Sequence, residues 1–220
     1  EIMPSLVGSE MCIRDRVAAG LNMGIAGIPW WTTDIGGFFG ANINDPEFHE
    51  LLVRWFEYGC FCPVMRLHGY RWPLQPQYGT TGGATCVSGA PNEVWSYTDQ
   101  VCEILSDYLR LRERMLPYIT ELMEEAHEKG TPVMRPLFYD FPEDKESWNV
   151  ETEYMFGPKV LVKPITDADA RETDVYLPGG ASWTNAWTGE TFEGGQKVHV
   201  AAPIEQIPLF TRDGYKLPMK

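Results

Sequence analysis

The chain has 220 residues, of which 44% are hydrophobic and 22% charged, and its formal net charge is −13. This composition is typical of a globular chain that can bury a sizeable core, and it excludes a disordered or membrane-spanning polypeptide. The acidic balance argues against a nucleic-acid partner, because phosphates demand a basic surface.

The first half of the chain alternates apolar strand-like runs with helical stretches. A helix is predicted from the cap Asp45-Pro46 to near Gly59. A second helix is predicted to begin at a capping box formed by Ser96 and Asp99. Pro117 should kink or restart this helix, because proline cannot continue the backbone hydrogen bonds. This rhythm indicates a parallel barrel or a doubly wound sheet.

The rhythm changes in the second half. The preceding helix is predicted to end at Lys129-Gly130 and to be followed by a strand at 133–138. Short strands separated by Gly and Pro turns then follow Tyr154. We expect them at 160–162, 172–176, 182–187 and 197–200. Their spacing is that of an antiparallel sandwich.

The cysteines and other metal-ligand types show no metal-site spacing. The five cysteines are Cys12, Cys60, Cys62, Cys86 and Cys102, and they form neither an even framework nor a CxxC pair. We expect buried thiols in a reducing compartment, which favours the cytoplasm without settling the location. Cys60 and Cys62 are predicted to share one face of a strand. We expect no metal and no cofactor.

Two motifs read as strand ends that deliver polar groups to a pocket. The first is Gly27-Ile-Pro-Trp-Trp-Thr-Thr-Asp-Ile-Gly-Gly-Phe38, and the second is Cys62-Pro-Val-Met-Arg-Leu-His-Gly69. In each, a short apolar run stops at a charged or aromatic side chain and a glycine turn follows. This is how α/β barrels place functional groups on their working face.

These residues closely resemble glycoside hydrolase family 31, the retaining α-glucosidases and α-xylosidases. The family motifs G-x-P-x-W-x-x-D-I-G-G-F and W-F-x-x-G-x-F-x-P-x-x-R-x-H-G stand here at 27–38 and 55–69. The resemblance implies the C-terminal part of a (β/α)8 TIM barrel at 17–151, followed by an incomplete antiparallel β-sandwich at 152–220. It implies hydrolysis of terminal α-linked glucose or xylose from an oligosaccharide substrate.

The first sixteen residues do not resemble the family. The stretch from Pro4 to Arg16 is similar to a translated sequencing adapter. We therefore expect residues 1–16 to be an artefact of that kind and exclude them from the fold. The expected consequence is that the native N-terminus is missing and that the chain is a C-terminal fragment.

Retaining glycosidases need two carboxylates, one as nucleophile and one as acid/base. The resemblance implies that both are aspartates, in W-x-D-x-N-E and W-x-G-D segments ahead of the Gly27 motif. Neither motif occurs in this sequence. We therefore expect the catalytic residues to be absent and the isolated chain to be inactive.

The residues that remain would hold the sugar. By resemblance, His68 would hydrogen-bond sugar hydroxyls and Asp34 would lie at the pocket floor. Phe38 and Trp31 would form the aromatic wall, although strand alternation leaves open whether Trp30 or Trp31 points inward. Arg66 would brace His68 through a nearby carboxylate, and an ordinary ion pair explains this arginine almost as well.

Two other functions stay open. One is another activity on the same scaffold, such as an α-galactosidase or a transglycosylase. The other is a non-catalytic carbohydrate-binding remnant built on the sandwich, where Trp183 and Trp187 are expected to share a strand face. The sequence leaves the oligomeric state open.

Overall fold

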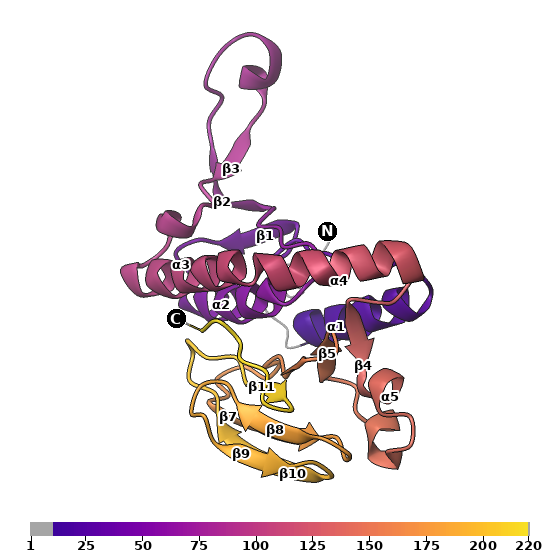
Figure 1. Cartoon of the computed structure of the whole chain (residues 1–220). Helices are drawn as coiled ribbons and strands as arrows, with labels where there is room; N and C mark the ends of the chain where they lie inside the picture. Colours follow the sequence, from indigo (N-terminus) through magenta and orange to yellow (C-terminus); the bar gives the residue numbers. More distant parts are fainter. Residues whose placement is uncertain (1–10, 220) are drawn as a thin grey trace.

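The computed structural model describes residues 11–219. Helices form one layer and antiparallel strands a second layer below it, and a thin arm rises from the helical side (Figure 1). The helical half contains α1 (Met11–Ile25), β1 (Phe39–Asn42), α2 (Pro46–Cys60), β2 (Tyr70–Gln75), β3 (Ser88–Ala90), α3 (Asp99–Arg114) and α4 (Leu116–Lys129).

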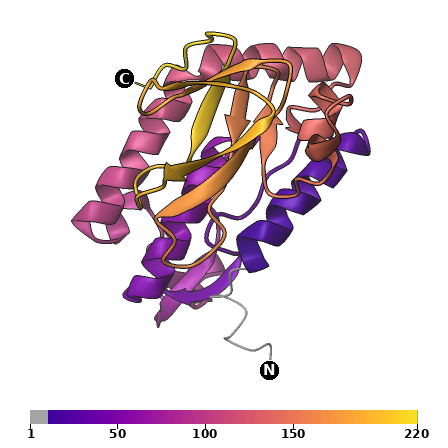
Figure 2. The same cartoon turned by 90° about the horizontal axis from the view of Figure 1, so that it is seen from below.

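The second half is a two-sheet antiparallel unit that lies across the helices (Figure 2). Its elements are β4 (Met134–Pro136), α5 (Leu137–Asp140), β5 (Tyr154–Phe156), β6 (Val160–Val162), β7 (Glu172–Leu177), β8 (Ser182–Asn185), β9 (Thr191–Glu193), β10 (Gln196–Ala201) and β11 (Leu209–Arg212). One sheet has the order β4-β5-β6-β11-β8-β9, and β10 pairs with β7 in the other.

The domain limits stay a prediction. Residues 1–10, most of the segment assigned to an adapter, lie outside the described residues. Residues 11–16 begin α1, and Ile13 is buried in the main core. At the other limit, β4 pairs with β5, so the antiparallel sheet takes in residues upstream of 152.

The helix ends follow local sequence signals. Asp45 caps α2 by accepting a hydrogen bond from the Glu47 amide, and Pro46 occupies the first turn. The predicted cap at Ser96 is wrong, because residues 94–96 form a 3-10 turn and Thr98 caps α3 instead. Pro117 lies in the first turn of α4, where its missing N–H costs nothing. Gly130 ends α4 in the left-handed conformation, as predicted.

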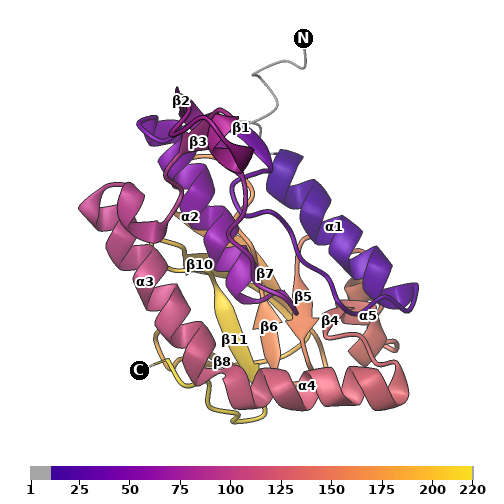
Figure 3. The ribbon, with the colours of Figure 1, turned by 90° about the horizontal axis from the view of Figure 1, so that it is seen from above.

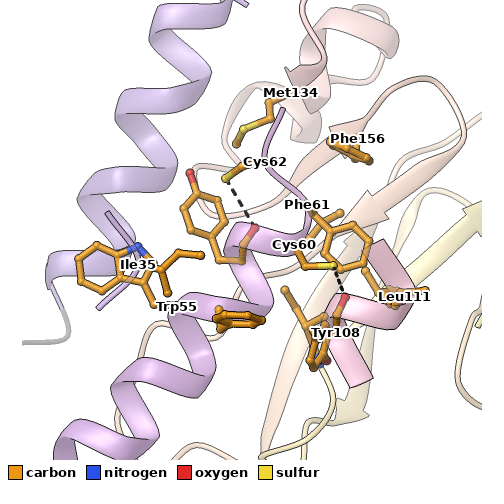
Figure 4. Packing of buried hydrophobic residues seen from close by; sticks show 14 of the residues in the cluster. Ile35, Trp55, Cys60, Phe61, Cys62, Tyr108, Leu111, Met134 and Phe156 are labelled. Carbon is orange, nitrogen blue, oxygen red and sulfur yellow. Dashed lines mark hydrogen bonds between the residues drawn. The ribbon is translucent and has the colours of Figure 1, made fainter. Parts of the chain in front are cut away.

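The strand predicted at 133–138 is partly wrong. Only residues 134–136 form a strand, and the helical turn α5 follows at once. The strand at Cys60–Cys62 is also wrong, because α2 runs through Cys60. The two thiols are buried and donate to the carbonyl oxygens of Tyr108 and Tyr58. Burial raises the pKa of both thiols to about 12, so they are inert packing groups (Figure 4).

The two segments predicted as barrel strands run side by side in extended conformation. The Val64 amide donates to the Trp31 carbonyl, and the Ile35 amide donates to the Arg66 carbonyl. The chain after α1 crosses the space between α1 and α2 before it reaches β1 (Figure 3). Beyond their ends, β1 and β2 pair in parallel, and β3 adds to β2 in antiparallel orientation to form the base of the arm.

A buried polar network joins the helical layer to the sheets. The Arg54 guanidinium on α2 donates to the carbonyls of Ala170 and Ala202 at 2.9 and 2.7 Å, and to that of Pro203 at 3.1 Å. Arg54 also pairs with Glu57 at 3.1 Å, and the Glu57 carboxyl lies 3.1 Å from the Tyr108 hydroxyl. One arginine therefore supplies donors to carbonyls that are buried or partly buried.

Replacing Arg54 should weaken the association between the helical layer and the sheets. We expect Arg54→Met to lower the free energy of unfolding by about 3–5 kcal/mol, because buried carbonyls and the Glu57 carboxyl lose their donor. Urea unfolding measures the change. Arg110→Met is the control, since Arg110 pairs with Asp107 on an exposed surface. Equal losses in the two variants would contradict the role assigned to Arg54.

The Glu57 carboxyl should make stability depend on pH. Burial is the main cause that raises its pKa from 4.5 to about 8. Between these values the folded state keeps a proton that the unfolded state releases, so the free energy of unfolding falls as pH rises. We expect wild type to lose stability relative to Glu57→Gln over this range. Urea midpoints of both proteins at several pH values test this, and a constant difference between them would refute it.

Candidate functional site

The helix α2 determines which side chains of the first extended segment can face a ligand. The Trp31 indole donates to the Tyr58 hydroxyl at 3.2 Å, and Thr33 accepts from the Trp55 indole at 2.9 Å. Ile35 is fully buried in the same core. Because successive side chains of an extended chain point to opposite sides, the odd-numbered residues face the helices.

The even-numbered residues therefore face away from α2. Trp30 is half exposed, and Asp34 is partly exposed on the same side. On the neighbouring segment, Val64, Arg66 and His68 are exposed in the same alternation. The two extended segments thus present one common face, on which the predicted polar residues gather at the carboxyl-terminal ends.

Asp34 and Arg66 form an ion pair across the two segments. The Arg66 Nε donates to Asp34 Oδ1 at 3.0 Å, and Nη2 donates to the same oxygen. The Asp34 side chain is 23% exposed and the Arg66 side chain is 51% exposed. Asp34 Oδ2 has no protein donor among the hydrogen bonds of the described chain. It is therefore positioned to accept from a ligand hydroxyl while Arg66 fixes the orientation of the carboxylate.

Phe38 and His68 form a second contact at the same ends. Their ring centroids lie 5.5 Å apart with an interplanar angle of 35°. Phe38 is 63% exposed, so most of its ring is open to contact from outside the chain. An imidazole can donate or accept, and an aromatic ring offers an apolar surface. The pair therefore combines a hydroxyl-binding group with a stacking surface.

A buried arginine holds the backbone beneath these residues. Arg71 on β2 donates to the carbonyls of Ile35 at 3.0 Å and Gly37 at 2.8 Å, and its guanidinium lies over the Phe48 ring of α2. A Cβ at Gly69 would lie 2.4 Å from the Gly37 carbonyl oxygen, so only glycine permits this approach. The turn after Asp34 and the turn after His68 are thereby packed together.

A second arginine sets the direction of the chain that leads to His68. Arg112 on α3 donates to the carbonyls of Cys60, Cys62 and Pro63 at 2.6–2.8 Å. Desolvation lowers the pKa of Arg112, and the neighbouring groups partly offset this shift. These three bonds fix the turn between α2 and the extended segment, and so they fix where Arg66 and His68 lie.

An apolar groove of about 980 Å³ runs along the other edge of the second segment, between that segment and α3 and α4. Trp30, Val64 and Leu67 line it from the extended chain, and Leu116, Ile119 and Met123 line it from α4. The amides of Met65 and Leu67, which alternate with the paired residues, make no backbone hydrogen bond within residues 11–219. This edge is open to a further segment of chain.

The structure brings together four of the five predicted site residues: Asp34, Phe38, Arg66 and His68. Trp31 does not join them, because its indole packs toward Tyr58 of α2. Trp30 is the tryptophan on the open face. The sequence contained a signal for this, since Trp30 and Asp34 are four residues apart and therefore share a side of an extended chain.

Trp183 and Trp187 do not form an exposed aromatic row on the sandwich. Trp183 is fully buried and donates to the Pro178 carbonyl at 3.0 Å. Within residues 11–219, no three His, Cys, Asp or Glu side chains converge as a metal site. None of the helices in this range combines the length and the apolarity needed to cross a bilayer.

Comparison with known proteins gives two family matches that follow each other along the chain. The TIM-barrel domain of glycosyl hydrolases family 31 matches residues 9–122, and the C-terminal domain of glycosyl hydrolase family 31 matches residues 130–217. An α-xylosidase of Saccharolobus solfataricus is 38% identical over 214 residues, which is 97% of this chain and 27% of the relative. Alpha-glucosidase 2 of Bacillus thermoamyloliquefaciens is 35% identical, over 88% of this chain and 22% of its own length.

Solved structures agree with the sequence matches. An α-xylosidase of this family from a soil metagenome, complexed with xylose, is 50% identical and superposes with a TM-score of 0.90, over 96% of this chain and 31% of that one. A Flavobacterium johnsoniae dextranase of the family is 30% identical with a TM-score of 0.81, over 95% of this chain and 24% of the dextranase. The chain thus spans between 22% and 31% of these relatives' length, and it belongs to glycoside hydrolase family 31.

Proposed function

We propose that this chain supplies the sugar-binding side of the active site of a retaining α-glycosidase that removes terminal α-linked xylose or glucose. The observation that carries the proposal is the convergence of Asp34, Arg66, His68 and Phe38 at the ends of two paired extended segments. A carboxylate, an imidazole and an open aromatic ring are the groups that a sugar with several hydroxyls and an apolar ring face requires.

The ligands of two relatives support a sugar of the size of xylose or glucose. The soil-metagenome α-xylosidase is complexed with xylose, and the Flavobacterium dextranase is complexed with glucose. We propose xylose or glucose at the position next to His68 and Asp34 on this ground. Of the two tryptophans, Trp30 is the one placed to contribute to the wall, because it shares the open face with Asp34.

The chemical step needs two further carboxylates. Retaining hydrolysis requires a nucleophile on the anomeric carbon and an acid/base at the leaving oxygen. Neither family motif for them occurs in this sequence. We propose that both come from the part of the relatives that this chain does not span. The open edge at Met65 and Leu67, with the apolar groove beside it, is a suitable place for that part of a barrel to pack.

In this proposal, His68 and Asp34 bind rather than react. They hold hydroxyls of the terminal sugar, and Arg66 keeps the Asp34 carboxylate in one orientation. Such contacts lower the energy of the transition state of hydrolysis only if they tighten as the sugar ring flattens toward the oxocarbenium-like state. The loss of either group should therefore reduce kcat/KM without changing the stereochemical outcome.

A graft tests the proposal. Residues 27–219 replace the matching part of the soil-metagenome α-xylosidase, and the release of nitrophenol from nitrophenyl α-xyloside is measured. We expect the graft to hydrolyse this substrate and the 220-residue chain alone to release no more than buffer. His68→Ala in the graft should lower kcat/KM by about 10- to 100-fold, the value of a lost hydrogen bond to a polar ligand.

The control is His199→Ala, because the His199 side chain is 60% exposed on β10 of the antiparallel unit and lies outside both the predicted site and the apolar groove. Three results would contradict the proposal: a folded graft with no activity, hydrolysis by the isolated chain, or His68→Ala with the kinetics of the control. Circular dichroism and the thermal midpoint of each graft establish that the variants fold.

A further inference from the structure

A second cavity, of about 670 Å³, lies between α3 and the loops of the antiparallel unit. The polar residues that line it from α3 are spaced three or four apart, so they share one side of the helix. These residues are Gln100, Glu103, Asp107, Arg110 and Arg114. The wall on the side of the antiparallel unit includes Trp187, Glu205 and Gln206. We call this space the α3 cavity.

The α3 cavity is separate from the candidate sugar site and from the apolar groove. None of the predicted site residues lines it. Leu109 and Arg112 of α3 line the groove, whereas Asp107 and Arg110 line the α3 cavity. By the 3.6-residue repeat of a helix, these two pairs lie on opposite sides of α3. Packing of the rest of a barrel in the groove would therefore take place on the other side of this helix.

Trp187 is held in one orientation at this cavity. Its indole Nε1 donates to the Ile207 carbonyl at 2.7 Å. The Asn185 side-chain oxygen accepts from the Trp187 amide at 2.9 Å and from the Thr188 amide at 3.2 Å, which fixes the turn. Trp187 nevertheless keeps 36% of its surface exposed. An indole that is fixed before a ligand arrives offers an apolar surface at a low cost in entropy.

Tyr108 of α3 joins the two walls of the cavity. Its hydroxyl accepts from the Ile207 amide at 3.0 Å and lies 3.2 Å from the Glu205 carbonyl oxygen. Tyr108 and Ile207 are both buried. Because Ile207 also accepts from the Trp187 indole, the position of this tryptophan relative to α3 is fixed. The α3 cavity is thus preorganised by hydrogen bonds behind its surface.

Several polar groups that line the cavity are available to a ligand. Within residues 11–219, the side-chain amides of Gln100 and Gln206 make no hydrogen bond. Asp107 uses Oδ1 for its ion pair with Arg110 at 2.7 Å, and its Oδ2 has no protein donor in the same range. Amides and an exposed ion pair present both donors and acceptors, which is what hydroxyl groups require.

The charges around the cavity select a neutral ligand. Three carboxylates line it against two guanidinium groups, and the whole chain carries a net charge of −13. The end of the chain lies beside α3 (Figures 1 and 3), and Arg114 already donates to the carbonyls of Pro218 and Met219 at 2.8 Å. A phosphate or a carboxylate would therefore be repelled from this cavity.

We propose that the α3 cavity is a second carbohydrate-binding site, which holds a neutral oligosaccharide apart from the candidate sugar site. A pyranose ring packs its C–H face on the Trp187 indole, while its hydroxyls bind Gln206 and the pair of Asp107 and Arg110. The volume of about 670 Å³ is typical of a pocket for a small organic ligand and accommodates a short oligosaccharide. Such a site anchors the chain on a polysaccharide without contact to the sugar that is cleaved.

The test measures binding and needs no hydrolysis. The full 220-residue chain is run in native gels that contain xyloglucan or soluble starch, two neutral polysaccharides. We expect at least one of them to retard the wild-type chain. Trp187→Ala should raise the dissociation constant from the retardation series by about tenfold, and Trp187→Phe, which keeps a ring, should recover part of the loss.

A second variant guards against a fold defect in Trp187→Ala. Gln206→Ala leaves every backbone contact in place and removes only a side-chain amide that makes no hydrogen bond within residues 11–219. We expect it to raise the dissociation constant by about three- to tenfold, the value of one lost hydrogen bond. The thermal midpoint of both variants shows whether they fold.

The matched control is Trp148→Ala. Trp148 is also an exposed tryptophan whose indole donates to a backbone carbonyl, that of Pro142 at 2.9 Å, but it lies outside the α3 cavity. His68→Ala tests whether the candidate sugar site causes the retardation instead. We expect both variants to be retarded as strongly as the wild-type chain.

Four results would overturn the inference. They are no retardation by either polysaccharide, equal losses in the Trp148 and Trp187 variants, full retardation of Gln206→Ala together with Trp187→Ala, and retardation that only His68→Ala abolishes. Sedimentation of the same samples gives a further decision. A dimer that Trp187→Ala dissociates would assign the α3 cavity to a second copy of the chain and not to a sugar.

The inference and the proposed function can fail separately. An inactive graft, together with retardation that depends on Trp187 and Gln206, would contradict the proposed function and support the second site. An active graft that depends on His68, together with no retardation of the 220-residue chain, would support the proposed function and overturn the second site.

Discussion

The structure depends on a single buried arginine that belongs to both of its layers. Arg54 projects from α2 and satisfies carbonyls of residues 170, 202 and 203 in the antiparallel unit, while Glu57 and Tyr108 complete the network from α2 and α3. A hydrophobic contact would hold the layers together without fixing their register. Directional bonds to several carbonyls allow one orientation, and this orientation sets the position of α2, against which the extended segments pack.

The position of α2 then determines the candidate site. Because Trp31, Thr33 and Ile35 are occupied by contacts with this helix or its core, Asp34 is left on the open side, where Arg66 from the neighbouring segment meets it. The site residues themselves are few and partly exposed. Their arrangement comes from groups behind them, above all Arg71, which holds the Ile35 and Gly37 carbonyls.

Much of this could be predicted from local signals in the sequence. Caps and turns in the sequence predict the start of α2 at Asp45-Pro46, the restart at Pro117 and the end of α4 at Gly130. Turns and alternation also predict β6, β7, β8 and β10, but they do not predict β5, β9 and β11. The errors arise where a distant contact decides. Ser96 has a side chain that can cap a helix, but this residue lies in a 3-10 turn. The helix α2 also continues beyond Gly59 and includes Cys60. Which of Trp30 and Trp31 faces outward is decided by Tyr58, and the roles of Arg54 and Arg71 have no local signature at all.

The three carbonyls held by Arg112 have a consequence for folding kinetics. Their donor lies 49 to 52 positions further along the chain, so the turn after α2 cannot be completed until α3 has docked. Contacts of such sequence separation form late, because the loop between them must first lose its entropy. Arg66 and His68 follow this turn directly. They are therefore among the last groups to reach their native places, and a nascent chain acquires its helices well before it acquires the candidate site.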